Sequence, residues 1–139
     1  MRRIIYKSIA SPDLDRAELF RLVYHARVAN EAQGLSGVLL QSDRRLLQVL
    51  EGPTWKLFAV FDTIRRDIRH SHVEVIDERS ITKATFPDWP MRYFDERSIG
   101  KALGVFEAEA PVRIRKPVED AVREFFVESF VTPNASALR

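Results

Sequence analysis

The chain contains no cysteine, and this absence removes several kinds of chemistry at once. Without thiols it forms no disulfide, builds no thiolate metal site and offers no cysteine nucleophile. A cysteine-free chain also fits a reducing cytoplasm, which is where we expect the protein to work. Histidine is scarce too, with three in 139 residues. His70 and His72 lie close together, but no carboxylate or third histidine stands at ligand spacing, so we expect no metal site.

An excess of charge of one sign is also missing. The chain has 22 basic and 20 acidic residues, a formal net charge of +2. Nucleic-acid-binding domains usually carry a large, clustered basic excess, so we expect no direct contact with nucleic acid. The basic stretch 113–116, between Pro111 and Pro117, is expected to be a solvated turn.

Long hydrophobic runs are absent as well. No apolar segment approaches the roughly 20 residues that a transmembrane helix needs, so we expect no membrane span. Near the N-terminus, Lys7 interrupts the apolar segment that follows Arg2 and Arg3. This pattern favours a first strand over a signal peptide.

Hydrophobic residues make up 45% of the chain and charged residues 30%, which is typical of one globular domain. The apolar periodicity predicts strands at 3–9, 35–40, 46–50, 73–76 with Ile81, and 89–94. It predicts helices at 15–30, 95–103 and 118–130. It also predicts a helix after residue 53, with Thr54 as its cap and an apolar stripe that ends at Ile68. The order βαββαββ indicates an α+β, ferredoxin-like fold. We expect a five-stranded mixed sheet with two helices on one face and the C-terminal helices on the other.

Two regions follow from this pattern. Residues 1–94 form the core, and residues 95–139 form a helical extension without a separate effector domain. The extension carries an aromatic face of Phe125, Phe126 and Phe130. We expect this face to cover the second face of the sheet or another chain.

Gln48 is the most unusual residue of the core. It lies within the apolar run 46–50, which predicts a strand buried on both faces. A buried amide must find partners, either from the core or from a ligand, because an unpaired one costs about 1–3 kcal/mol. If the first and third strands are neighbours, Tyr6 and Gln48 lie side by side beneath the helices. Trp89 and Met91 are expected to share one face of the last strand.

These motifs resemble the BLUF family of blue-light sensors that use a flavin. The matching residues are Tyr6 with Ser8, Asn30 ahead of residues 34–37, the run 47–52, and the segments 67–71 and 86–91. The resemblance covers roughly residues 3–94. Pro90 departs from the family pattern, and it leaves open whether Trp89 or Met91 faces inward.

The resemblance implies a specific cofactor and site. FAD would be held non-covalently between the first two helices, with FMN or riboflavin as possible substitutes. The expected flavin-binding residues are Tyr6, Leu22, Asn30, Gln48, Ile64, Arg66, Asp67, Arg69 and His70. Light would drive electron and proton transfer from Tyr6 through Gln48, and the flavin hydrogen bonds would rearrange. Trp89 and Met91 would relay the signal.

The resemblance therefore implies a non-enzymatic photoreceptor that signals in trans. Its partner would be a cyclic-nucleotide signalling enzyme or a transcription regulator, and we also expect a homo-oligomer. Two alternatives remain open at this point. One is a ferredoxin-like ligand- or nucleic-acid-binding module without flavin, in which Leu22 and Ile64 are ordinary core and Asn30 a helix cap. The other is a flavin-dependent enzyme, which the lack of an obvious general base disfavours.

Overall fold

A five-stranded sheet lies between two pairs of helices in the computed structural model, which describes residues 1–131 and side chains as far as residue 128. Phe130, part of the predicted aromatic face, therefore lies outside the described side chains. The strands are β1 Arg2–Ala10, β2 Ser36–Ser42, β3 Arg45–Gly52, β4 His70–Ser80 and β5 Arg92–Phe94. The helices are α1 Arg16–Gln33, α2 Thr54–Arg66, α3 Ile99–Glu109 and α4 Val112–Val131. No helix in this described part is long and apolar enough to cross a bilayer.

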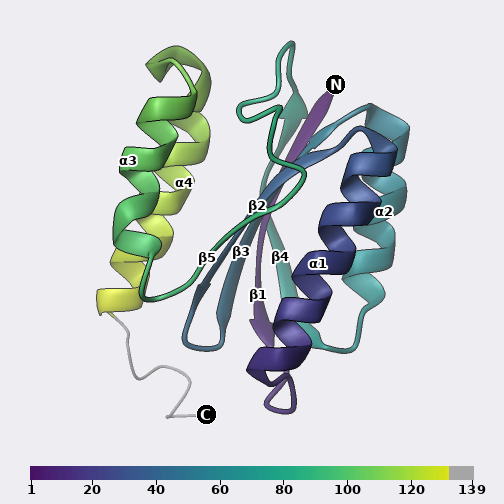
Figure 1. Ribbon diagram of the computed structural model, residues 1–139, viewed down its shortest axis with the longest axis vertical. Coiled ribbons are helices and arrows are strands. Elements are labelled where there is room, and N and C mark those ends of the chain that lie inside the picture. The colour runs from purple at the N-terminus through teal and green to yellow at the C-terminus, as the bar shows by residue number, and fades with distance from the viewer. Residues whose placement is uncertain (132–139) are drawn as a thin grey trace.

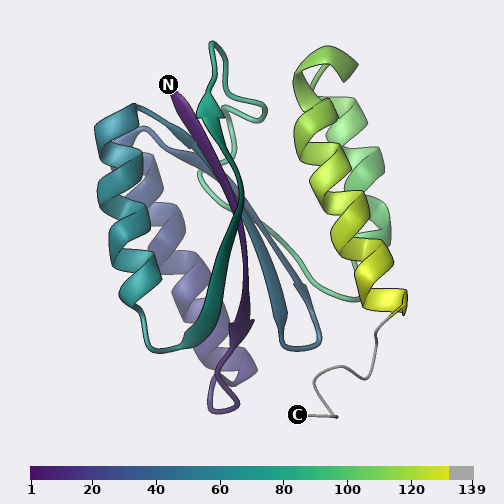
Figure 2. The ribbon, with the colours of Figure 1, turned by 180° about the vertical axis from the view of Figure 1, so that it is seen from behind.

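The sheet has the order β4-β1-β3-β2-β5. Strand β1 pairs antiparallel with β3 and β4, β2 pairs antiparallel with β3, and β5 joins β2 in parallel. Helices α1 and α2 cover one face, and α3 and α4 cover the other (Figures 1 and 2). The predicted ferredoxin-like, α+β fold with a mixed sheet is confirmed.

Two apolar cores form, one on each face of the sheet. Alternate residues of β1 and β3 serve the two cores, because successive strand side chains point to opposite faces. The core beneath α1 and α2 contains Ile4, Tyr6, Leu19, Val23, Leu50, Leu57, Phe61 and Met91. The core beneath α3 and α4 contains Ile5, Leu47, Val49, Phe86, Trp89, Phe106, Val118, Val122 and Phe125. The C-terminal helices therefore cover the sheet of their own chain.

The first helix begins and ends as its sequence predicts. Asp15 caps α1, since its side-chain Oδ1 accepts a hydrogen bond from the Glu18 N–H at 2.8 Å. Gly34 ends the helix at φ 70°, a left-handed conformation that glycine adopts without steric cost. The prediction for α2 was less accurate. Pro53 precedes this helix without a side-chain cap, so Thr54 is not the cap. Ile68 lies beyond the helix end and is 92% exposed, so it does not belong to the apolar stripe.

The basic stretch 113–116 is helical, so the predicted solvated turn is wrong. These residues form the first turns of α4, and Pro117 lies inside the helix. Arg115 explains why the segment stays against the protein. Its guanidinium donates to the Ala110 carbonyl at 2.7 Å and pairs with Glu119 at 3.0 Å. These bonds offset the one backbone hydrogen bond that Pro117 cannot donate.

Candidate functional site

Tyr6 and Gln48 face each other across neighbouring strands. The antiparallel register of β1 and β3 places Tyr6 directly opposite Gln48. Both side chains are buried under α1 and α2, and the Tyr6 hydroxyl donates a hydrogen bond to Gln48 Oε1. The predicted neighbourhood of a phenol and a carboxamide is therefore confirmed.

The other end of the Gln48 amide is poorly satisfied. Among the residues that the structure describes, the partner of Gln48 Nε2 is Met91 Sδ at 4.0 Å. A thioether sulfur is a weak acceptor, whereas a primary amide carries two N–H donors. Since a buried donor without a good acceptor is costly, this end of the amide is suited to bonding a ligand.

A cleft opens beside this pair, on the face of the sheet that carries α1 and α2. It holds about 580 Å³ of empty space, counting the part open to solvent. Its apolar lining comes from Leu14, Leu19, Leu22, Val23, Ala26, Leu39, Leu46, Ile64 and Met91. Its polar lining comes from Tyr6, Gln48, Asp67, Arg69 and His70. Apolar walls with a few convergent polar groups are typical of a site for a planar organic ligand.

The polar end of the cleft lies where α2 gives way to β4. Asp67 accepts hydrogen bonds from the Arg69 backbone N–H at 2.9 Å and from the Arg69 guanidinium. The guanidinium hydrogen bond is the main reason that the pKa of the Asp67 carboxyl is lowered, so this group is charged at neutral pH. A cation held in place at the cleft mouth offers charge-assisted donors to an anionic ligand group.

His70 has a defined tautomer in this structure. Its Nε2 lies 2.6 Å from the Ile64 carbonyl, which only accepts, so Nε2 must carry a proton. In the neutral ring Nδ1 then accepts from the Ser8 hydroxyl at 2.9 Å. These two bonds fix the His70 ring next to Tyr6, whose ring centroid lies 6.2 Å away.

The environment of Tyr6 keeps its phenol protonated. Burial raises the pKa of Tyr6 well above its usual range, and the negative charge of Asp67 raises it further. The phenolic proton therefore stays on Tyr6 at neutral pH, in its hydrogen bond to Gln48.

Two of the predicted cofactor residues lie outside the cleft lining. Asn30 is buried at the end of α1, where its Nδ2 donates to the Pro90 carbonyl at 2.8 Å. The Arg66 side chain is 77% exposed, and its guanidinium pairs with Asp62 at 2.9 Å. The remaining seven predicted residues, Tyr6, Leu22, Gln48, Ile64, Asp67, Arg69 and His70, line the cleft.

Trp89 and Met91 do not share a face, so that expectation is wrong. The last strand begins at Arg92, and the two residues precede it in irregular backbone. Met91 lines the cleft and is 3% exposed. Trp89 enters the opposite core, where it stacks on Phe86 with ring centroids 4.4 Å apart. The inward position beside Gln48 is therefore held by Met91.

A buried ion pair was not anticipated from the sequence. Glu51 follows Gln48 in β3, and its carboxylate lies 3.4 Å from the Arg3 guanidinium. It also accepts hydrogen bonds from the Thr85 N–H at 2.6 Å and the Thr85 hydroxyl at 2.8 Å. This network holds the segment before Trp89 against the sheet. A charged residue at the end of an otherwise apolar strand was the signal available in the sequence.

Comparison with known proteins identifies the family to which this fold and cleft belong. Residues 1–92 match the family described as sensors of blue-light using FAD. The chain belongs to the BLUF family. A BLUF domain is a flavin-binding light sensor rather than a catalyst, and the alternative of a regulatory module without flavin is not favoured.

Individual BLUF relatives support this assignment. The photoactivated adenylate cyclase subunit alpha of Euglena gracilis is 32% identical over 94 residues, which are 66% of this chain and 9% of that protein. The BLUF protein BlrB, in a dark-state structure, is 25% identical with a TM-score of 0.72, covering 88% of this chain and 92% of BlrB. BlrP1 of Klebsiella pneumoniae, in a manganese and cyclic-diGMP complex, is 26% identical with a TM-score of 0.77, covering 99% of this chain and 34% of BlrP1.

The residues of the cleft fit the flavin that BLUF domains bind. Leu22 and Ile64 supply apolar walls from α1 and α2, on either side of the cleft. Gln48 offers an N–H donor to the polar edge of a ring, and Arg69 offers a cation at the cleft mouth. No group of three or more potential metal ligands occurs among the residues that the structure describes.

Proposed function

We propose that this BLUF domain holds FAD between α1 and α2 and reports blue light through the Tyr6–Gln48 pair. The observation that carries the proposal is the Gln48 amide itself. Its carbonyl is engaged by the Tyr6 hydroxyl, while its amide nitrogen has a weakly accepting sulfur as partner inside the cleft. A side chain with one end held and the other available is suited to a change of hydrogen-bonding state.

When bound, the flavin supplies absorption of blue light and a strong oxidant in its excited state. The residues of the chain then divide the work. Tyr6 would give up an electron to the excited flavin and its phenolic proton by way of Gln48, whose Oε1 already accepts the hydrogen bond from the Tyr6 hydroxyl. The electron and the proton would then return to Tyr6, with Gln48 left rotated or tautomerised. The amide suits this role because its donor and acceptor ends have nearly the same shape.

FAD is the form of flavin that we propose, because Arg69 lines the cleft and the exposed side chain of Arg66 lies at the end of α2, three residues before Arg69 in the chain. Cations there would attract the phosphates of a dinucleotide tail. FMN carries one phosphate and riboflavin none, so they would gain less from these residues.

The bound flavin can be identified directly. We expect protein purified in the dark to be yellow and to release FAD on denaturation, as resolved by chromatography against FMN and riboflavin. Replacing both Arg66 and Arg69 by Gln should weaken FAD binding more than riboflavin binding in a fluorescence titration. Equal losses for the two ligands would contradict the assigned role of these cations.

We further propose that the signal passes to a separate protein, either a cyclic-nucleotide signalling enzyme or a transcription regulator. The relatives support this proposal, because they include a photoactivated adenylate cyclase and a protein solved with cyclic diGMP. Cytoplasmic location and homo-oligomer formation stay predictions. Affinity capture from cell extract in light and in darkness, followed by mass spectrometry, would test the partner, and equal capture in both would contradict it.

A further inference from the structure

The segment Trp89–Pro90–Met91 crosses from one face of the sheet to the other within three residues. Trp89 is buried among the side chains beneath α3 and α4, and Met91 is buried in the cleft under α1. Pro90 lies between them and has no backbone N–H to donate to a hydrogen bond of the sheet. Because the segment joins both cores, a movement of Met91 is mechanically linked to Trp89.

Three consecutive backbone carbonyls hold this crossing in place. The Trp89 carbonyl accepts from the Gly37 N–H in β2 at 2.9 Å. The Pro90 carbonyl accepts from Asn30 Nδ2 at 2.8 Å. The Met91 carbonyl accepts from Arg27 Nε at 3.1 Å. Two of the three donors are side chains of α1, the helix whose Leu22, Val23 and Ala26 line the cleft.

Met91 is closely surrounded on the sheet side. A Cβ placed on Gly37 would lie 3.1 Å from the Met91 methyl and 3.0 Å from the Val49 carbonyl, so any larger residue there would displace Met91. On its other side Met91 Sδ is 4.0 Å from Gln48 Nε2. A turned Gln48 amide presents an oxygen to that sulfur instead of an N–H, and the contact becomes unfavourable. Met91 must then shift, and the hydrogen bonds on its backbone oppose that shift.

We infer that Arg27 is a positioning residue that holds Met91 against Gln48 and so sets the rate of dark recovery. This inference rests on the function proposed above. Arg27 is the most informative of the three donors, because its side chain is not part of the core. Asn30 is buried, and there is no room for a side chain at Gly37, so substitution of either residue would disturb the packing as well. Arg27 does not itself line the cleft, and it acts on the lining residue Met91 through the Met91 backbone carbonyl.

The chain offers an unusually direct probe of Met91. It has two methionines, Met1 and Met91, so methyl-labelled methionine gives two NMR signals. Met1 is 46% exposed and Met91 is 3% exposed, and a Met91→Leu variant assigns the signals. Arg27→Ala should move or broaden the Met91 methyl signal in the dark. It should also make recovery of the light-induced spectrum slower by about threefold to tenfold, the range that one hydrogen bond of ordinary net strength allows, because the bond that draws Met91 back to its dark position is lost.

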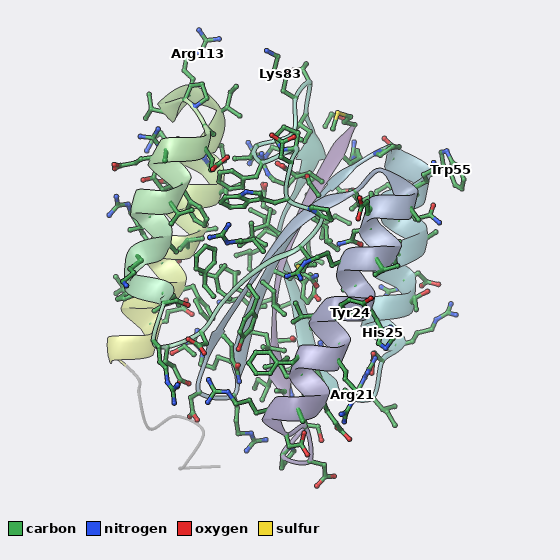
Figure 3. The ribbon with its side chains drawn as sticks, in the orientation of Figure 1. Arg21, Tyr24, His25, Trp55, Lys83 and Arg113 are labelled. Carbon is green, nitrogen blue, oxygen red and sulfur yellow. The ribbon has the colours of Figure 1, made fainter. Side chains whose placement is uncertain are left out.

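Two further variants complete the test. Arg21→Ala removes an exposed arginine of the same helix that points away from the sheet (Figure 3), and it should leave the signal and the rate unchanged. Arg27→Lys keeps the charge and moves the donor, so its recovery rate should lie between those of wild type and Arg27→Ala. A wild-type Met91 signal and recovery rate in folded Arg27→Ala would overturn the inference. If the wild-type protein shows no light-induced shift at all, the proposed function fails instead, while the methyl signal still tests whether Arg27 positions Met91.

Discussion

The two residues to which we assign the photochemistry share a buried contact, in which the Tyr6 phenol donates to Gln48 Oε1 and thereby orients the whole amide. The Tyr6 phenol is uncharged and protonated at neutral pH, because burial and the charge of Asp67 both raise its pKa. In the proposal its oxidation is accompanied by loss of the proton toward Gln48, the residue that already accepts its hydrogen bond. Tyr6 is thus both the electron source and the proton source in our proposal.

Tyr6→Phe removes the hydroxyl and leaves the ring in place. We expect this variant to bind flavin and to lose the light-induced red shift. It should also unfold more easily, by about 1 kcal/mol, because Gln48 Oε1 loses its buried donor. Absorption spectra before and after blue light, with denaturant titration, measure both effects.

The matched control for this variant is Tyr93→Phe. Tyr93 also donates to a glutamine, Gln41 Oε1 at 2.5 Å, but it does not line the cleft. The Tyr93→Phe variant should keep the full light-induced red shift. Loss of the shift in Tyr93→Phe, or its retention in Tyr6→Phe, would contradict the role assigned to Tyr6.

The raised pKa of Tyr6 also predicts how stability depends on pH. Above about pH 10 a tyrosine of the unfolded chain loses its proton, while folded Tyr6 keeps it. The unfolded state then binds fewer protons, so the stability that is fully present below pH 10 falls as pH rises toward the folded pKa. For Tyr6 alone the slope is about 1.4 kcal/mol per pH unit.

Denaturant unfolding of wild type and Tyr6→Phe at several alkaline pH values tests this prediction. The wild-type protein should lose stability more steeply than the variant. Tyr93, whose pKa is raised to about 12 by burial and by Asp95, contributes to the slope of both proteins. Parallel slopes for the two proteins would show that Tyr6 is not protected from ionisation by the fold.

Among the secondary-structure elements, those with strong periodicity were predictable and those defined by tertiary contacts were not. Strand β3 is signalled in the sequence by its buried apolar run, and α1 by its cap residue and its terminal glycine. These local signals were enough to predict that Tyr6 and Gln48 are neighbours. The register of β5 has no such signal. Its segment is held by Gly37, Asn30 and Arg27, which are distant in sequence, so alternation placed Trp89 and Met91 wrongly on one face. Helix α4 was missed at its start because Pro117 is a helix breaker whose effect tertiary packing overrides.

Asn30 shows the same limit at the candidate site. The family resemblance predicts a flavin contact, and the structure shows its amide bonded to the Pro90 carbonyl. A sequence gives the helix face of such a residue but not which of several nearby polar groups it will bond. The contact of Asn30 with flavin stays a prediction.

Ion pairs connect helix α4 to β1 and β3, the strands that carry Tyr6 and Gln48. Glu128 pairs with Lys7 at 3.3 Å and also with Arg45, and these cations follow Tyr6 in β1 and begin β3. Glu128→Gln should lower the free energy of unfolding by about 1 kcal/mol at low salt, because it removes a partly buried carboxylate from two cations. The loss should shrink as salt is added, since salt screens such pairs.

The control on the same helix is Glu124→Gln, which alters an exposed carboxylate. It should leave stability unchanged at both salt concentrations. Both variants should keep their flavin and their red shift, because neither residue lines the cleft. Equal stability of wild type and Glu128→Gln at low salt would show that this ion cluster does not hold α4 to the sheet.

The whole molecule is a sheet with a chromophore cleft on one face and a covered apolar face on the other. Lys7 and Trp89 lie on the second face close in the chain to residues of the cleft, because Lys7 follows Tyr6 and Trp89 precedes Met91 by two residues. Removing residues 111–139 would expose the apolar side chains beneath α3 and α4, including Phe106. Single substitutions at the edge of α4 are therefore a better test of signal output than truncation.

The central claim is that a flavin bound between α1 and α2 changes its hydrogen bonding to Gln48 when Tyr6 is oxidised by light. The most direct measurement is the absorption spectrum of the purified protein in darkness, after blue light and during return to darkness. The account predicts a yellow protein whose flavin bands shift to the red and return in the dark. A colourless protein that takes up no added FAD, or a yellow one whose spectrum is unchanged by light, would contradict it.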